Sequence, residues 1–135
     1  MRGKGMILIT GGAWQGKTAY AVSHYCLEDK DIADGAVCSP VDVLTAPAVS
    51  HFHLLIRRMM ENDEDPDAYS QRLMRENPDL IVITDEIGCG IVPMDPFERA
   101  WREKTGRICI SLAAFSRKVI RMNCGIAAVI KDADH

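Results

Sequence analysis

Several kinds of segment are missing from this chain of 135 residues. No apolar run approaches the roughly 18 residues that a membrane-spanning helix requires. The basic start, residues 1–5, is followed by an apolar run of only Met6–Ile9, whereas the apolar core of a secretory signal spans about 7–15 residues. No internal repeat or low-complexity tract is present either. These absences predict a cytoplasmic protein with no membrane partner.

Basic charge and paired cysteines are also scarce. The formal net charge is −3, whereas nucleic-acid-binding domains usually present a basic field, so no nucleic-acid partner is predicted. The five cysteines are odd in number and include no Cys-x-x-Cys pair. This pattern argues against a disulfide framework or a structural zinc site. We expect the cysteines to be small, buried, reduced thiols.

The remaining composition is that of an ordinary globular protein, with 47% hydrophobic and 26% charged residues. A chain of this length is expected to form one domain, residues 1–135, with a single core. The length and composition therefore indicate no particular function, and the local motifs have to be considered instead.

Strands and helices are predicted to alternate along the chain. Short continuous apolar runs predict buried strands at residues 6–10, 36–38, 80–84, 119–122 and 126–130. Apolar residues at helical spacing predict helices at residues 17–28, 48–60, 67–76 and from Pro96 to Phe115, with polar connections at 29–35 and 61–67. This alternation indicates an α/β fold with a mostly parallel sheet.

The segment Gly11–Thr18, GGAWQGKT, fits the pattern G-x-x-x-x-G-K-[ST] at every fixed position. Glycines let backbone N–H groups curl toward phosphate oxygens, and the following helix presents its positive N-terminus to the same anion. Lys17 is expected to reach the β- and γ-phosphates, and the Thr18 hydroxyl to ligate Mg²⁺. Trp14 either stacks on a base or packs on a neighbouring element. The predicted nucleotide-binding residues of this loop are Gly11, Gly12, Ala13, Trp14, Gln15, Gly16, Lys17 and Thr18.

Two adjacent carboxylates, Asp85 and Glu86, follow the predicted strand at 80–84. This arrangement has the form of a Walker B strand. If that strand lies parallel beside the first, it delivers both carboxylates to the edge of the sheet that carries the phosphate loop. One carboxylate would then hold Mg²⁺ and the other would position or deprotonate the attacking group, and the spacing leaves open which does which. The alternative is a pair of solvated acids at a strand end.

Three stretches, in the same order, resemble the adenosylcobinamide kinase/adenosylcobinamide-phosphate guanylyltransferase family of cobalamin biosynthesis. ITGGAWQGKT resembles that family's TGGxxSGKS, and ITDEIGCGIVP resembles its xSNEVGxGIVP. Residues 97–131, with GRICISLAA and CGIAAVIK, resemble the family's C-terminal pattern. These stretches cover about half of the chain, and Gly90–Pro93 is the most specific of the markers, because phosphate loops occur in many families.

The resemblance implies a P-loop NTPase-type, three-layer α/β fold and a homo-oligomer. It also implies two activities that use ATP or GTP with Mg²⁺. Members phosphorylate the aminopropanol hydroxyl of adenosylcobinamide, and they then transfer GMP from GTP to that phosphate through a guanylylated histidine.

The chain departs from the family pattern in its middle part. Val41–Thr45 resembles the family's DCLT strand, which would place Asp42 near the nucleotide and would leave out the segment that carries the guanylylated histidine. Alternatively, His53 stands in for the histidine of the family's His-x-x-x-Arg. Cys109 and Ile110 replace an Asn-Gln pair, which puts substrate contacts by that helix in doubt. Asp85 replaces an asparagine and makes the site more like a standard Mg²⁺ strand.

The leading prediction is a nucleotide-dependent kinase resembling adenosylcobinamide kinase, with guanylyl transfer weakened or lost. Lys17, Asp85 and Glu86 are the predicted catalytic residues, Thr18 and Asp85 the predicted Mg²⁺ ligands. The predicted partners are ATP or GTP and a cobinamide-like small molecule. Two alternatives stay open: a non-catalytic nucleotide-binding or regulatory module, and a small NTPase that acts on an unrelated metabolite.

Overall fold

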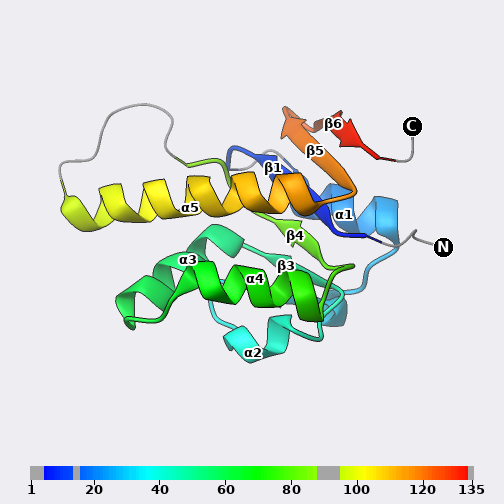
Figure 1. The fold of residues 1–135 in the computed structure, drawn as a ribbon. Helices are drawn as coiled ribbons and strands as arrows, with labels where there is room; N and C mark the ends of the chain where they lie inside the picture. Colours follow the sequence, from blue (N-terminus) through cyan, green and yellow to red (C-terminus); the bar gives the residue numbers. More distant parts are fainter. Residues whose placement is uncertain (1–4, 14–15, 88–94, 134–135) are drawn as a thin grey trace.

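The computed structural model describes residues 5–13, 16–87 and 95–133, and a six-stranded sheet forms its centre (Figure 1). The order of the strands across the sheet is β2-β3-β4-β1-β5-β6. The strands β1 to β5 pair in parallel, and β6 pairs with β5 in the antiparallel sense. Their bounds are β1 Ile7–Gly11, β2 Ile32–Asp34, β3 Ala48–Ser50, β4 Ile81–Ile83, β5 Lys118–Asn123 and β6 Ile126–Asp132.

Helices cover both faces of this sheet. The α-helices of the described chain are α1 Lys17–Tyr25, α2 Pro40–Val43, α3 Phe52–Glu61, α4 Pro66–Glu76 and α5 Pro96–Phe115, and a 3-10 turn, η1, spans Asp29–Asp31. The helices α3, α4 and α5 contact one another and lie together in Figure 1. Among the described residues, no helix is long and apolar enough to cross a membrane.

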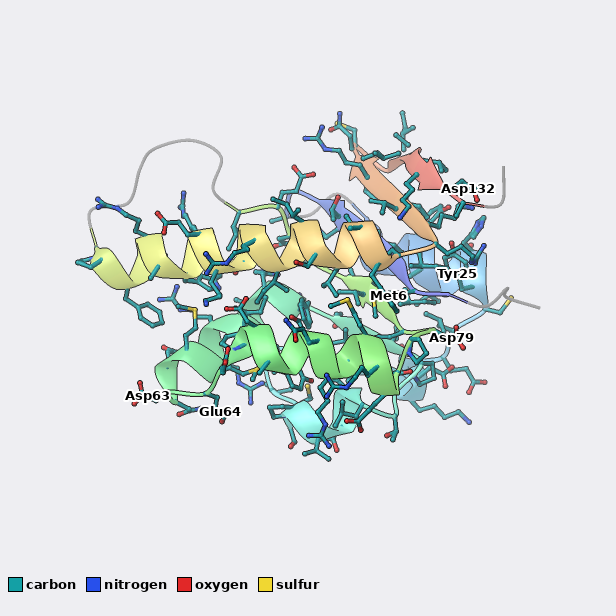
Figure 2. All side chains as sticks on the ribbon, viewed as in Figure 1. Met6, Tyr25, Asp63, Glu64, Asp79 and Asp132 are labelled. Atoms are coloured by element: carbon teal, nitrogen blue, oxygen red, sulfur yellow. The ribbon has the colours of Figure 1, made fainter. Side chains whose placement is uncertain are left out.

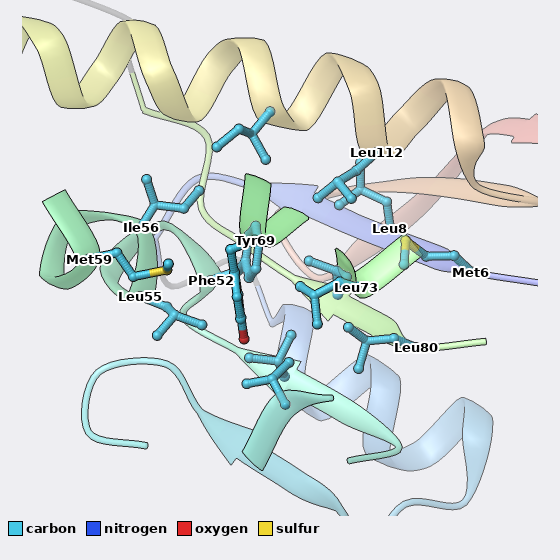
Figure 3. Close-up of a cluster of buried hydrophobic side chains, with 14 of the residues drawn as sticks. Met6, Leu8, Phe52, Leu55, Ile56, Met59, Tyr69, Leu73, Leu80 and Leu112 are labelled. Carbon is cyan, nitrogen blue, oxygen red and sulfur yellow. The ribbon is translucent and has the colours of Figure 1, made fainter. Parts of the chain in front are cut away.

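Two apolar clusters show which helix packs on which face. Successive side chains of a strand point to opposite faces, so Leu8 and Val82 join one cluster while Ile7 and Ile81 join the other. The larger cluster includes side chains of α3, α4 and α5, with Phe52 near its middle (Figure 3). The smaller cluster includes residues of α1 such as Ala21. The predicted three-layer α/β fold with a mostly parallel sheet is therefore confirmed.

The predicted helices at 67–76 and from Pro96 onward are confirmed with clear start signals. Each begins at a proline, which is well tolerated in the first helical turn. The preceding aspartates cap them: the Asp65 carboxylate accepts the N–H groups of Asp67 and Ala68, and Asp95 accepts that of Phe97. The acidic connection before α4 is confirmed as well, with Asp63 and Glu64 at the surface (Figure 2).

Two assignments in the middle of the chain were wrong. The second strand is Ile32–Asp34 rather than residues 36–38, because Val37 and Cys38 turn back to bond the carbonyl of Asp34. The predicted helix at 48–60 is instead a strand, β3, followed by α3. His51 separates the two, with a left-handed φ of 50° that no continuous helix tolerates.

Other expectations failed at single positions. Val41–Thr45 was expected as a strand, but Pro40–Val43 forms the short helix α2. Helix α1 ends at Tyr25, earlier than expected, because Cys26 adopts a left-handed φ of 55°. Cys26 and Cys124 are exposed rather than buried.

Candidate functional site

The sheet topology brings the phosphate loop and the paired carboxylates together. β1 and β4 are parallel neighbours with Ile7 opposite Ile81 and Ile9 opposite Ile83. Both strands therefore end at the same edge of the sheet, where ligands of open α/β sheets bind. Beyond the strand ends, the N–H of Glu86 donates to the carbonyl of Gly11 over 2.8 Å. The arrangement expected from the two motifs is confirmed at this level.

Two glycines of the loop adopt backbone conformations that side chains disfavour. Gly11 has a φ of +145°, and a Cβ added there would lie 2.5 Å from the carbonyl oxygen of Met122 on β5. Gly16 has a φ of +84° and immediately precedes α1. Glycine is the residue that reaches such φ values at no steric cost. Gly11 therefore lies close against β5, and Gly16 supplies the backbone conformation that leads into α1.

Lys17 occupies the centre of this edge. Its ammonium donates to the Gly12 carbonyl at 2.7 Å, and it lies 2.7 Å from Oδ1 of Asp85. The side chain is only 7% exposed. A lysine so placed presents one concentrated positive charge, flanked by the N-terminus of α1, which also favours anions.

A first cavity of about 260 Å³ opens beside Lys17 on the α1 side of the sheet. Its wall includes Thr18 and Asp85, whose oxygens are of the kind that Mg²⁺ prefers. The full lining is Ala13, Gly16, Lys17, Thr18, Ala19, His51, Ile83 and Asp85. The predicted Mg²⁺ ligands therefore share one cavity with the predicted phosphate-binding lysine.

His53, on α3, holds Asp85 through both of its ring nitrogens. The backbone N–H of Asp85 donates to Nδ1 at 3.2 Å, so the ring proton sits on Nε2, which lies 3.3 Å from Asp85 Oδ2. Burial lowers the pKa of His53, and the Asp85 charge opposes that shift. The indole N–H of Trp101 donates to the His53 carbonyl at 2.8 Å. Helices α3 and α5 therefore fix the position of Asp85.

Glu86 points to a different set of partners. Arg121 of β5 forms a two-pronged ion pair with it, with Nε 2.9 Å from Oε1 and Nη2 3.1 Å from Oε2. The Thr10 hydroxyl donates to Oε1 at 3.4 Å. Asp85 and Glu86 are thus adjacent in sequence but belong to separate networks, one around Lys17 and the other around Arg121.

A second cavity of about 350 Å³ lies on the α5 side of the same edge. Burial, with the charge of Glu86 adding to it, raises the pKa of Cys109 in its wall to about 11. Asp85 belongs to the walls of both cavities. The lining residues are Leu8, Thr10, Thr84, Asp85, Glu86, Ile87, Thr105, Gly106, Cys109, Ile110, Ala113 and Val119.

Some predicted site residues lie elsewhere. Asp42 is on α2, where its carboxylate accepts the N–H of Ser39 at 3.4 Å as part of a helix cap, and it does not line the first cavity. The strand that would have placed it at the nucleotide does not exist. Trp14, Gln15 and the Gly90–Pro93 segment lie outside the described residues. The other predicted residues, Gly11, Gly12, Ala13, Gly16, Lys17, Thr18, Asp85 and Glu86, are gathered at the sheet edge.

Sequence reasoning missed His51 and Asp34. His51 follows β3 and Asp34 ends the neighbouring strand β2, and Nδ1 of His51 lies 3.0 Å from Oδ1 of Asp34. His51 reaches the first cavity from the strand beside β4. A local signal is present in the apolar pair Ala48-Val49 after Pro47, but the helical spacing of apolar residues over 48–60 predicts a helix there.

The described residues contain no group of three or more His, Cys, Asp or Glu side chains that could hold a metal ion. The predicted Mg²⁺ ligands are two residues, Thr18 and Asp85, which line one cavity.

The comparisons with known proteins point to one family. The family model described as "cobinamide kinase / cobinamide phosphate guanyltransferase" matches residues 38–130. A search of curated proteins found no match. The matched range begins after the phosphate loop at Gly11–Thr18, so the loop and the match are independent observations. Because the match spans more than half of the 135 residues, the chain belongs to the cobinamide kinase / cobinamide phosphate guanyltransferase family.

Proposed function

We propose that this protein is a kinase that transfers the γ-phosphoryl group of ATP or GTP to a hydroxyl of a cobinamide-like acceptor. One observation carries the proposal: Lys17, at the start of α1, lies 2.7 Å from Asp85 at the end of the neighbouring strand. A phosphate-binding cation and a candidate Mg²⁺ ligand thus meet at one cavity, in a chain of a kinase family.

The residues of the loop would act by charge and position. The Lys17 ammonium, now shared between Gly12 and Asp85, would turn to the terminal phosphate oxygens, which carry more negative charge than one carboxylate. Asp85, released from Lys17 and still held by His53, would bind the metal with Thr18. Mg²⁺, when bound, would neutralise charge on the phosphates. Alignment and charge neutralisation supply most of the rate in phosphoryl transfer.

The test is an assay with the purified chain, Mg²⁺, ATP or GTP, and cobinamide, in which phosphorylated cobinamide is sought by mass spectrometry. We expect Lys17→Ala to reduce product formation by roughly 100-fold or more, because it removes a preorganised charge at the transferring group. Lys30→Ala is the matched control, since that lysine is 80% exposed and pairs only loosely, at 3.2 Å, with Glu28.

The same assay separates the alternatives. Nucleotide binding without product would favour a regulatory module, and hydrolysis that cobinamide does not change would favour an NTPase for another metabolite. Equal activity of Lys17→Ala and the wild-type chain would contradict the proposed site.

For guanylyl transfer, the geometry favours His51 over His53 as the histidine that carries GMP. His53 is buried, and Asp85 engages both of its ring nitrogens. His51 is about half exposed, lines the first cavity and is oriented by Asp34. In the GTP arm of the assay, an intact-mass gain of one GMP should be present with His24→Ala and absent with His51→Ala. No gain in the wild-type chain would mean that this activity is lost.

A further inference from the structure

We propose that the second cavity binds the hydroxyl-bearing arm of the acceptor, as an uncharged aliphatic alcohol. The inference rests on the proposed kinase function and adds to it where the acceptor binds. A phosphoryl transfer requires two ligands that meet at one point. Asp85 lies in the walls of both cavities, so a phosphate in the first and an alcohol in the second would meet beside it.

The position of the second cavity suits this role. Leu8 and Val119 place it on the face of the sheet that carries α5, opposite the face that carries α1. Thr10, Asp85 and Glu86 form its end at the carboxyl edge of β1 and β4. An acceptor there would lie next to Asp85, the residue that both cavities share.

The chemistry of the wall selects a neutral ligand. The described residues that line the cavity include two carboxylates and no lysine, arginine or histidine. Each carboxylate already pairs with a cation outside this wall, Asp85 with Lys17 and Glu86 with Arg121, so the wall favours an uncharged ligand over an anionic one. The rest of the wall is mostly apolar, supplied by Leu8, Ile87, Ile110, Ala113 and Val119. Such a surface favours an aliphatic chain.

Thr105 provides an independent sign of a polar ligand. Its side chain lines the cavity and is only 1% exposed, yet Oγ1 has no hydrogen-bond partner among the described residues. A buried hydroxyl without a partner is costly and uncommon in folded proteins. An amide or hydroxyl of a bound acceptor would satisfy it, while the acceptor's reacting hydroxyl faces Glu86.

The size of the cavity limits the ligand. A volume of about 350 Å³ is near the lower end of the range of small-molecule pockets, roughly 300–1,000 Å³. The cavity therefore accommodates a short arm, and a large acceptor such as cobinamide would keep its ring system outside.

The transfer step balances with the groups present. The acceptor oxygen forms a bond to the γ-phosphorus, and the bond from that phosphorus to the β–γ bridging oxygen breaks. Its electron pair leaves with the nucleoside diphosphate. The hydroxyl proton passes to a carboxylate oxygen of Glu86, which Arg121 and Thr10 hold at the cavity end.

The experiment uses two probes, cobinamide and N-acetyl-1-amino-2-propanol, which represents the arm alone. Thr105→Val keeps the shape of the side chain and removes its hydroxyl, and we expect the acceptor KM to rise roughly tenfold. Ala113→Leu fills the cavity and should weaken the binding of both probes at least tenfold. Neither change should alter the affinity for a triphosphate, measured by titration. Ala100→Leu, the same substitution at an exposed position of α5, is the control.

Binding of each probe is also measured directly, by calorimetry, so that the cavity and the kinase function are tested separately. Probe binding that Ala113→Leu abolishes, without any product, would support the cavity and overturn the kinase function. Product formation with an unchanged acceptor KM in both variants would overturn the cavity and leave the kinase function standing. Failure of both probes to bind the wild-type chain would also overturn the cavity.

Discussion

At the scale of single residues, His53 is the side chain on which the geometry of Asp85 depends. It is 5% exposed and contacts both the backbone N–H and the carboxylate of Asp85. A histidine with both nitrogens engaged has a fixed tautomer and ring orientation. His53 is therefore a positioning residue for the acidic strand end, and this role explains why a polar ring is buried against Trp101.

We predict that His53→Ala lowers the free energy of unfolding by about 2–4 kcal/mol, because it leaves a cavity and an unpaired N–H at Asp85. His53→Gln keeps an amide donor near the carboxylate and should recover part of the loss. Urea denaturation measures both values. His24→Ala, at an exposed position on α1, should change stability by less than about 1 kcal/mol. A value for His53→Ala within the error of the wild type would refute the positioning role.

At the scale of elements, the phosphate loop begins at Gly11, where β1 lies very close to β5. The register pairs Gly11 with Met122, and the space for a Cβ at Gly11 is filled by the Met122 carbonyl. The strand can therefore turn into the phosphate loop at this point only with glycine.

We predict that Gly11→Ala lowers the free energy of unfolding by about 2–4 kcal/mol, through a strained φ and a backbone clash. Gly106→Ala on α5 is the matched control, because its added Cβ meets nothing within 4 Å. That change should be neutral or stabilising, by up to about 1 kcal/mol. Thermal unfolding of the two variants compares them directly, and equal melting temperatures would contradict the close approach at Gly11.

Elements with strong local signals were predictable, and elements that depend on neighbours were not. The apolar runs at β1 and β4 and the proline starts of α4 and α5 are local features, and their positions were predicted within a few residues. β2 and β3 are three residues long and are stabilised as strands by pairing with each other and with β4. Pairing of that kind leaves almost no periodic pattern in the sequence. His51, with a left-handed φ of 50°, interrupts a segment whose apolar residues recur at helical spacing.

At the scale of the whole molecule, the site follows from the order of the strands. The loop at Gly11–Thr18 and the carboxylates Asp85 and Glu86 were predictable because each lies within one motif, and a parallel sheet places strand ends together. His51, Asp34 and the second cavity were not predictable. They depend on which strands are neighbours and on where α5 crosses the sheet.

The edge of the sheet also couples ligand binding to the stability of the fold. The first cavity is lined by residues of β4, of the start of α1 and of the segments that follow β1 and β3, so a triphosphate bound there would stabilise only the folded chain. At 100 times its Kd, such a ligand adds about 2.7 kcal/mol, and we predict a rise in Tm on the order of 5–10 °C for a chain of this size.

Lys17→Ala tests whether that stabilisation comes from the proposed phosphate contacts. The variant loses an ion pair whose lysine is buried, so its own Tm falls, and each shift is measured from the variant's baseline. Differential scanning fluorimetry with Mg²⁺ and ATP or GTP should show the full shift in Lys30→Ala and little of it in Lys17→Ala. A full shift in Lys17→Ala would contradict the proposed contact between Lys17 and the phosphates, because that contact would then contribute nothing to nucleotide binding.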